Sequence, residues 1–177
     1  MDVLSNKLVT DNPVNRCYYC KQGVFGTILE AAKNDGMTVI LDGTNASDDA
    51  GDRPGMKALQ EMKVLSPLRM CGYVKSEIRK QSKEAGLFVY NKPSYACLAT
   101  RIPTGTEIDE EKIKQVETAE TFLFDLGFSD FRVRWMDNKA KIQMPESQLQ
   151  ALMEKREIVL EELSKIFDEV LLDLRTR

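Results

Sequence analysis

Residues 131–144 carry the pattern that most restricts the fold of this chain. In FRVRWM, residues 131–136, apolar side chains alternate with basic ones, and DNK separates this run from AKIQM, residues 140–144. Strict alternation is typical of a strand with one buried face. Two such runs joined by a turn rich in Asp and Asn predict a β-hairpin. We therefore expect a small α+β unit built around this hairpin.

Helical patterns flank the predicted hairpin. The segment DEEKIKQVETAETFLFDLG, which begins at residue 109, opens with acidic residues that favour the helix dipole and repeats apolar residues along one face. A long helix is expected over residues 146–167, and EVLLDL after it predicts a last strand. We place a domain boundary between residues 103 and 107. The small α+β carboxyl-terminal domain then occupies residues 105–177.

The part of the chain before this boundary follows a different pattern, in which helices alternate with short apolar runs. Residues 1–23 are expected to be irregular and polar. A helix is then expected over residues 24–34, and a short apolar run at 39–41 predicts a strand. Two more helices are expected over residues 56–62 and 75–85. Such alternation predicts an α/β layer with buried parallel strands. We expect an α/β domain over residues 1–104.

Composition excludes several classes of function. The net charge of -3 and the pI of about 5.2 argue against a broad nucleic-acid or anionic-membrane surface, because such surfaces cluster Lys and Arg. Histidine is absent, which excludes Ser-His-Asp and Cys-His catalysis and His-ligated zinc. No apolar run approaches the roughly 20 residues that cross a bilayer. We expect a cytoplasmic protein with neither a nucleic-acid nor a membrane partner.

The cysteines supply the candidate nucleophile. Cys17 and Cys20 have the spacing of a redox pair or of half a metal site, but no second CxxC completes such a site, so they also fit ordinary thiols. Cys97 lies in the aperiodic loop NKPSYACLATRIPTG, between Lys92 and Arg101. Nearby cations favour the nucleophilic thiolate, and loops carry function disproportionately. Cys97 is therefore a candidate catalytic residue, although a lone cysteine in a loop is inert in most proteins, and the identity of any metal stays unknown.

A turn motif follows the strand predicted at residues 39–41. The carboxyl ends of parallel strands are where open α/β sheets bind ligands, so this motif is a candidate nucleotide site, although its residue types equally suit an ordinary turn. Its members are Asp42, Gly43, Thr44 and Asn45. Three acids follow that could hold a divalent cation or only solvate a loop: Asp48, Asp49 and Asp52.

Arg132 and Arg134 are the candidate anion ligands. They stand two residues apart on a predicted strand, so both side chains leave the same face. Two adjacent guanidinium groups can bind a phosphate or a carboxylate, and the alternative is a solvated outer face of the hairpin. None of the ten glycines falls in a phosphate-cradling G-x-G-x-x-G or G-x-x-x-x-G-K-[ST] pattern.

Three strings resemble the LarE family of the PP-loop ATP pyrophosphatase superfamily in their order and spacing. They are NPVNRCYYCK at residues 12–21, LDGTNASDDAGDRPGMKAL at 41–59 and KPSYACLATRIPTG at 92–105. The resemblance implies a Rossmann-like parallel sheet in the first domain. Because the first strand and the SGGxDS loop of that family have no counterpart in this sequence, we expect the domain to be partial and the chain to be an N-terminally truncated form.

The resemblance also implies an activity. ATP with Mg2+ would adenylate a carboxylate of a small nucleotide substrate, a pyridinium biscarboxylate mononucleotide, and Cys97 would donate its sulfur to that carboxylate and end as dehydroalanine, as in nickel-pincer cofactor biosynthesis. The family pattern places the nucleotide near residues 42–45 and the substrate phosphate or carboxylate near Arg101, Arg132 and Arg134. It also implies a homo-oligomer. The alternatives are another PP-loop activity, namely tRNA thiolation or amide-forming ligation, and a non-catalytic oligomerising module.

Overall fold

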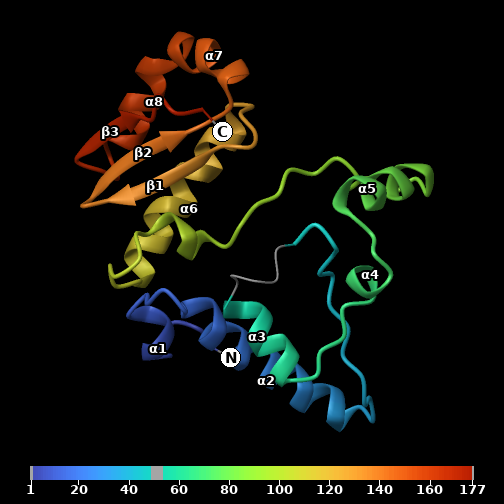
Figure 1. Cartoon of the computed structure of the whole chain (residues 1–177). Coiled ribbons are helices and arrows are strands. Elements are labelled where there is room, and N and C mark those ends of the chain that lie inside the picture. Colours follow the sequence, from blue (N-terminus) through green and yellow to red (C-terminus); the bar gives the residue numbers. More distant parts are fainter. Residues whose placement is uncertain (1, 49–53, 177) are drawn as a thin grey trace. The chain divides into compact units, whose positions relative to one another are not determined.

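The computed structural model describes residues 2–48 and 54–176 and divides the chain into two compact units. The first unit is Met1–Lys92 and the second is Pro93–Arg177, coloured from blue to green and from green to red in Figure 1. The loop that carries Cys97, which the sequence assigns to a first domain ending at residue 104, thus belongs to the second unit.

Helices make up most of the described part of the first unit. They are α1 (Lys7–Thr10), α2 (Arg16–Asn34), α3 (Pro54–Glu61), α4 (Pro67–Met70) and α5 (Lys75–Glu84). Helix α3 lies along α2 (Figure 1). The strand expected at residues 39–41 is reduced to one parallel bridge between Leu41 and Leu65. A single bridge is parallel pairing at one position, and it does not confirm a Rossmann-like sheet.

Helix α2 corrects the expectation that residues 1–23 are irregular. It begins at Arg16, before the apolar spacing that the sequence shows at 24–34. Contacts with α3 explain the longer helix: the Tyr18 hydroxyl donates to Glu61 Oε2 at 2.6 Å, and the Lys21 side chain packs over Gly55. Polar contacts of this kind leave no apolar periodicity, so the pattern alone misses them.

The second unit is a mixed α+β fold. Its elements are η1 (Leu98–Arg101), α6 (Glu110–Asp125), β1 (Arg132–Met136), β2 (Lys139–Gln143), η2 (Glu146–Gln148), α7 (Leu149–Glu154), α8 (Arg156–Leu163) and β3 (Glu169–Leu172). The sheet has the order β1-β2-β3, with β1 antiparallel and β3 parallel to β2. The predicted hairpin is confirmed. Its turn residues, Asp137 and Asn138, have φ angles of 47° and 59°, as two-residue hairpin turns require.

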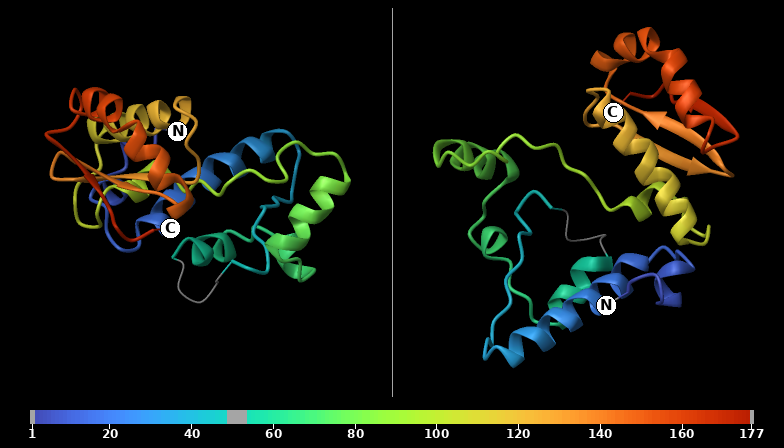
Figure 2. Two further views of the ribbon diagram at one scale, coloured as in Figure 1. Left: turned by 90° about the horizontal axis from the view of Figure 1, so that it is seen from above. Right: turned by 180° about the vertical axis from the view of Figure 1, so that it is seen from behind.

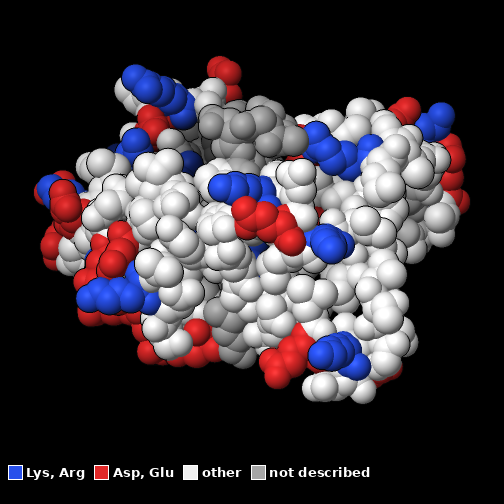
Figure 3. Space-filling view, turned by 60° about the horizontal axis from the view of Figure 1, so that its bottom comes forward, with Lys and Arg blue, Asp and Glu red and all other residues white. Residues whose placement is uncertain are grey.

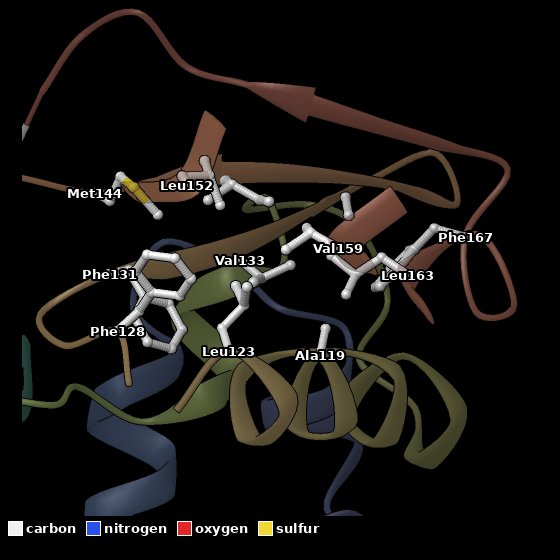
Figure 4. Close-up of a cluster of buried hydrophobic side chains, with 12 residues drawn as sticks. Ala119, Leu123, Phe128, Phe131, Val133, Met144, Leu152, Val159, Leu163 and Phe167 are labelled. Atoms are coloured by element: carbon white, nitrogen blue, oxygen red, sulfur yellow. The ribbon is translucent and has the colours of Figure 1, made fainter. Parts of the chain in front are cut away.

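One apolar cluster holds the second unit together. In Figure 4 the side chains of Leu123 on α6, Val133 on β1 and Leu163 on α8 point toward one another, and all three are fully buried. Helix α6 lies beside β1 (Figure 1), and Figure 2 gives two further views of the chain. The single long helix expected over 146–167 instead breaks at Lys155, between α7 and α8. The break lets Leu152 and Val159 both face this cluster.

Candidate functional site

Cys97 stands at the start of the short helix η1. It is the N-cap residue, with φ -51° and ψ 139°, and its side chain is exposed. The backbone N–H and the hydroxyl of Thr100 both donate to the Cys97 carbonyl oxygen, at 2.9 and 2.7 Å. These two hydrogen bonds fix the backbone of Cys97 and thereby define the position of its Cα–Cβ bond.

A buried ion pair anchors this turn to the rest of the unit. Arg101, which is 1% exposed, donates through Nε to Glu120 Oε1 at 2.7 Å and through Nη2 to Oε2 at 2.9 Å. Its Nη1 donates to the carbonyl oxygen of Ala96 at 3.1 Å and lies 3.5 Å from that of Cys97. Glu120 Oε1 also accepts the backbone N–H of Val133 at 2.9 Å. The pair thereby links the thiol loop to both α6 and β1.

A pocket opens beside the thiol. Its volume is about 380 Å³, and Cys97, Tyr95, Phe124, Glu117 and Glu120 are among the residues that line it. The rings of Tyr95 and Phe124 form an aromatic wall, with their centroids 5.0 Å apart. The two glutamates come from α6. A planar ligand could therefore rest against the aromatic wall with its reactive group near the thiol.

The two strand arginines brace the segment that carries Cys97. They leave the same face of β1, as expected, and lie opposite residues of β2. Arg132 is 5% exposed, donates to the carbonyl oxygen of Ser94 at 2.6 Å and lies 5.2 Å from the centroid of the Tyr95 ring. Arg134 is half-buried and donates to the carbonyl oxygen of Thr100 at 2.5 Å. The structure thus brings Arg101, Arg132 and Arg134 to one loop.

Arg134 also lines a second pocket, of about 290 Å³, together with Trp135 and Lys141. Its Nε donates to Gln143 Oε1 at 2.9 Å. Of the three arginines named by the sequence, Arg101 and Arg132 are buried and Arg134 is half-buried. Their role as anion ligands stays a prediction, and Arg134 is the best placed of them to meet a ligand.

The DGTN motif in the first unit forms a hydrogen-bonded turn. The Asp42 carboxylate accepts hydrogen bonds from the Ser66 hydroxyl at 2.6 Å and from the Thr44 hydroxyl at 2.5 Å and backbone N–H at 3.2 Å. Partial burial works to raise the pKa of Asp42, but these bonds outweigh it and hold the pKa below its usual value. Gly43 and Asn45 lie in the same turn. Nucleotide binding by this motif stays a prediction.

The acids after this motif give no cation site in the described part of the chain. Asp48 accepts the backbone N–H of Asn45 at 3.0 Å, while Asp49 and Asp52 lie outside the described residues. Cys17 and Cys20 both lie on helix α2. Within residues 2–48 and 54–176 no group of three or more Cys, Asp and Glu side chains is placed to hold a metal ion.

Charges of both signs are mixed on the surface. On the face shown in Figure 3, Lys and Arg side chains lie among Asp and Glu side chains. Among the described helices, none combines the length and the apolar character that a bilayer crossing requires.

Glu120 and Glu117 are residues of this site that the sequence patterns did not single out. For Glu120 a signal was present. On the helix expected from residue 109 it falls four residues after Val116 and next to Ala119, within the apolar stripe. A carboxylate in a buried stripe requires a cationic or hydrogen-bonding partner. Nothing in the sequence identifies that partner as Arg101, 19 residues earlier.

Comparisons with known proteins agree with the resemblance seen in the three strings. The chain is 37% identical over 164 residues to an uncharacterized protein of Synechocystis sp., covering 93% of this chain and 60% of the relative. It is 31% identical over 159 residues to an uncharacterized protein of Methanocaldococcus jannaschii, covering 90% and 62%. No family model matches the chain.

A third relative has an assigned activity. It is the pyridinium-3,5-bisthiocarboxylic acid mononucleotide synthase of Lactiplantibacillus plantarum, 32% identical over 175 residues, which are 98% of this chain and 63% of the synthase. The chain spans about three fifths of the length of these relatives. Its likeness to the synthase along almost the whole sequence supports a relationship with the LarE-like proteins.

Proposed function

We propose that this chain is the sulfur-donating part of a transferase that builds a thiocarboxylated mononucleotide. The observation that carries the proposal is the exposed Cys97 thiol beside a pocket of about 380 Å³, on a turn that a buried ion pair holds in place. Similarity to a bisthiocarboxylic acid mononucleotide synthase supplies the substrate class. A thiol held in this way is oriented for attack on a bound electrophile.

The proposed reaction has two steps. In the first, Cys97 Sγ attacks the carbonyl carbon of an adenylated carboxylate of the pyridinium biscarboxylate mononucleotide. A C–S bond forms, the bond to the phosphate oxygen breaks, and AMP leaves. In the second, the Cα proton of residue 97 is removed and the Cβ–S bond breaks, so the sulfur stays on the substrate as a thiocarboxylate. Residue 97 becomes dehydroalanine, and each chain reacts once.

The proposal also covers the nucleotide site, the anion ligand and the assembly of the protein. ATP with Mg2+ supplies the adenylate, and the nucleotide-binding residues of the first unit are Asp42, Gly43, Thr44 and Asn45. The phosphate or the second carboxylate of the substrate pairs with Arg134, which lines the neighbouring pocket. The working assembly is a homo-oligomer in the cytoplasm.

The test supplies the activated substrate directly. The chain is incubated with a chemically prepared acyl-adenylate of the mononucleotide, which bypasses ATP activation, and is followed by intact-protein mass spectrometry with peptide mapping. We expect an adduct on Cys97 that resolves to loss of the elements of hydrogen sulfide at that residue. Because Cys71 is also exposed, the Cys71→Ala variant is the matched control and should react like the unmodified chain. The Cys97→Ala variant should show no such loss.

Two results would overturn the donor assignment. One is acylation spread evenly over the exposed thiols of Cys17, Cys71 and Cys97, without elimination. The other is a thiolated product with Cys97 left intact, which would favour a PP-loop activity that recycles its sulfur source. A non-catalytic oligomerising module would give neither adduct nor product.

A further inference from the structure

The elimination at Cys97 requires a base, and this chain contains no histidine to act as one. We propose that Glu117 is that base, and that the hydrogen bonds on the Cys97 carbonyl oxygen make the Cα proton removable. This role rests on the proposed function. It assigns the proton transfer in the second step to residues of this chain.

The ionisable groups of the thiol pocket leave one carboxylate available. Glu120 accepts both N–H groups of the Arg101 pair and the backbone N–H of Val133, so its lone pairs are occupied and its charge is balanced. The Tyr95 hydroxyl oxygen accepts the backbone N–H of Asp130 at 3.0 Å. Glu120 is thus occupied by Arg101 and by the backbone of Val133, and it serves to hold the thiol loop.

Glu117 differs from these groups. It lies on α6, three residues before Glu120, and lines the same pocket as Cys97. Residues three apart lie on one face of a helix, so Glu117 adjoins the anchored pair without belonging to it. Its side chain is exposed and forms no hydrogen bond or ion pair with any residue that the structure describes.

The backbone of Cys97 is arranged to support removal of its own Cα proton. When that proton leaves, negative charge develops on the carbonyl oxygen of the same residue. This oxygen already accepts the N–H and the hydroxyl of Thr100, and Arg101 Nη1 lies 3.5 Å away. Donors fixed before the reaction stabilise such a charge without reorganisation, as in an oxyanion hole.

The step balances without a further reactant. The Glu117 carboxylate takes the Cα proton, the C–H electron pair becomes the Cα=Cβ bond, and the Cβ–S pair leaves with the sulfur as the substrate thiocarboxylate. A bound substrate displaces water from the pocket that Glu117 and Cys97 line, so the proton passes directly between groups of the chain.

The test separates the two chemical steps. The Glu117→Gln variant, with the prepared acyl-adenylate, should form the Cys97 thioester at the rate of the unmodified chain and then accumulate it. Loss of the base should slow elimination by about 10²- to 10⁴-fold. The control is Glu111→Gln, the same change on the same helix outside the pocket, which should eliminate normally. Thr100→Val should also slow elimination, because it removes the hydroxyl donor.

The outcomes distinguish this role from the proposed function. A thioester that resolves in Glu117→Gln as fast as in the unmodified chain overturns the assignment of Glu117 and leaves Cys97 as the donor. Equal slowing in the Glu111→Gln control also overturns it, because the effect would then come from charge alone. If the unmodified chain forms no thioester on Cys97, the proposed function fails and this role fails with it.

Discussion

Arg101 and Glu120 meet through two parallel hydrogen bonds in the interior of the second unit, Nε to Oε1 at 2.7 Å and Nη2 to Oε2 at 2.9 Å. The side chains of this pair are 1% and 6% exposed, so neither charge has ready access to water. Each partner also forms a hydrogen bond with the backbone. Arg101 donates to the carbonyl oxygen of Ala96, and Glu120 accepts the N–H of Val133. The geometry of the thiol loop therefore depends on an ion pair whose second member, Glu120, lies outside the loop on α6.

Removal of one member of this pair should destabilise the second unit strongly. Arg101→Met leaves the Glu120 carboxylate buried without its cation, which costs about 3–5 kcal/mol of unfolding free energy. Urea unfolding followed by the fluorescence of Trp135, the single tryptophan, measures this loss. The double variant Arg101→Met with Glu120→Leu removes both charges and should recover most of the loss. A double variant as unstable as the single one would contradict this account.

The matched control is an exposed pair in the same unit. Arg156 and Glu157 lie 3.5 Å apart with side chains 61% and 89% exposed. Because water solvates both groups, Arg156→Met should change the unfolding free energy by only about 0–1 kcal/mol. A comparable loss in the two Arg→Met variants would show that charge number, and not burial, sets the effect.

The conservative change Arg101→Lys should loosen the thiol loop while the unit stays folded. Lysine keeps the charge but lacks the planar fork that binds Glu120 and Ala96 together. Loss of a hydrogen bond to a charged group, worth about 1.5–3 kcal/mol, should raise local opening about tenfold or more. Hydrogen exchange of peptides over residues 96–102 measures it, with the β1–β2 hairpin as internal reference. Unchanged protection over 96–102 would show that Arg101 does not hold the loop.

The sequence predicts the second unit better than the first, and the reason lies in the range of the interactions. Helix α6 and the hairpin are recognisable from local periodicity and from the Asp-Asn turn, so both were expected close to their observed bounds. The strand expected at 39–41 depends on partners distant in the sequence, and only the bridge from Leu41 to Leu65 forms among the described residues. Local periodicity in the sequence cannot identify a strand partner that lies far away along the chain.

The candidate site shows the same division. Cys97 can be named as a candidate from the sequence because its loop lacks periodicity and its string resembles a known family, and its role stays a prediction. The sequence does not show which arginine is buried and which faces solvent, because a charged residue on a strand is expected to be solvated until its partners are known. Arg132 proves to be buried through contacts with Ser94 and Tyr95, which lie nearly 40 residues earlier in the chain.

Arg132 and Arg134 should respond differently to the same change. Arg134→Gln should weaken binding of the unactivated mononucleotide about tenfold or more, since a charge-assisted hydrogen bond contributes about 1.5–3 kcal/mol. Arg132→Gln should instead lower the unfolding free energy, because it removes buried bonds to backbone oxygens and the contact with Tyr95. Calorimetric titration measures the first effect and urea unfolding the second. Binding unchanged by Arg134→Gln would remove Arg134 from the substrate site.

Asp173 should make the unfolding free energy of the second unit depend on pH in the acidic range. Hydrogen bonds from Gln143, from the backbone of Arg175 and from Lys141 lower the pKa of Asp173 to about 2. In the unfolded chain the pKa of an aspartate is about 3.9. The carboxylate therefore stabilises the fold fully above about pH 4, and this contribution is lost as the pH falls toward 2.

The comparison of the unmodified chain with Asp173→Asn tests this linkage. At about pH 6 the variant should be the less stable of the two, because it loses the charged acceptor that ties β3 to Gln143 and Lys141 on β2. At about pH 3 the difference should shrink, since the unfolded chain, in which the pKa of Asp173 is about 3.9, binds a proton there and is stabilised relative to the folded chain. Urea midpoints from Trp135 fluorescence at both pH values give the two differences. A difference that stays constant or grows toward low pH would mean that another group carries the acid sensitivity.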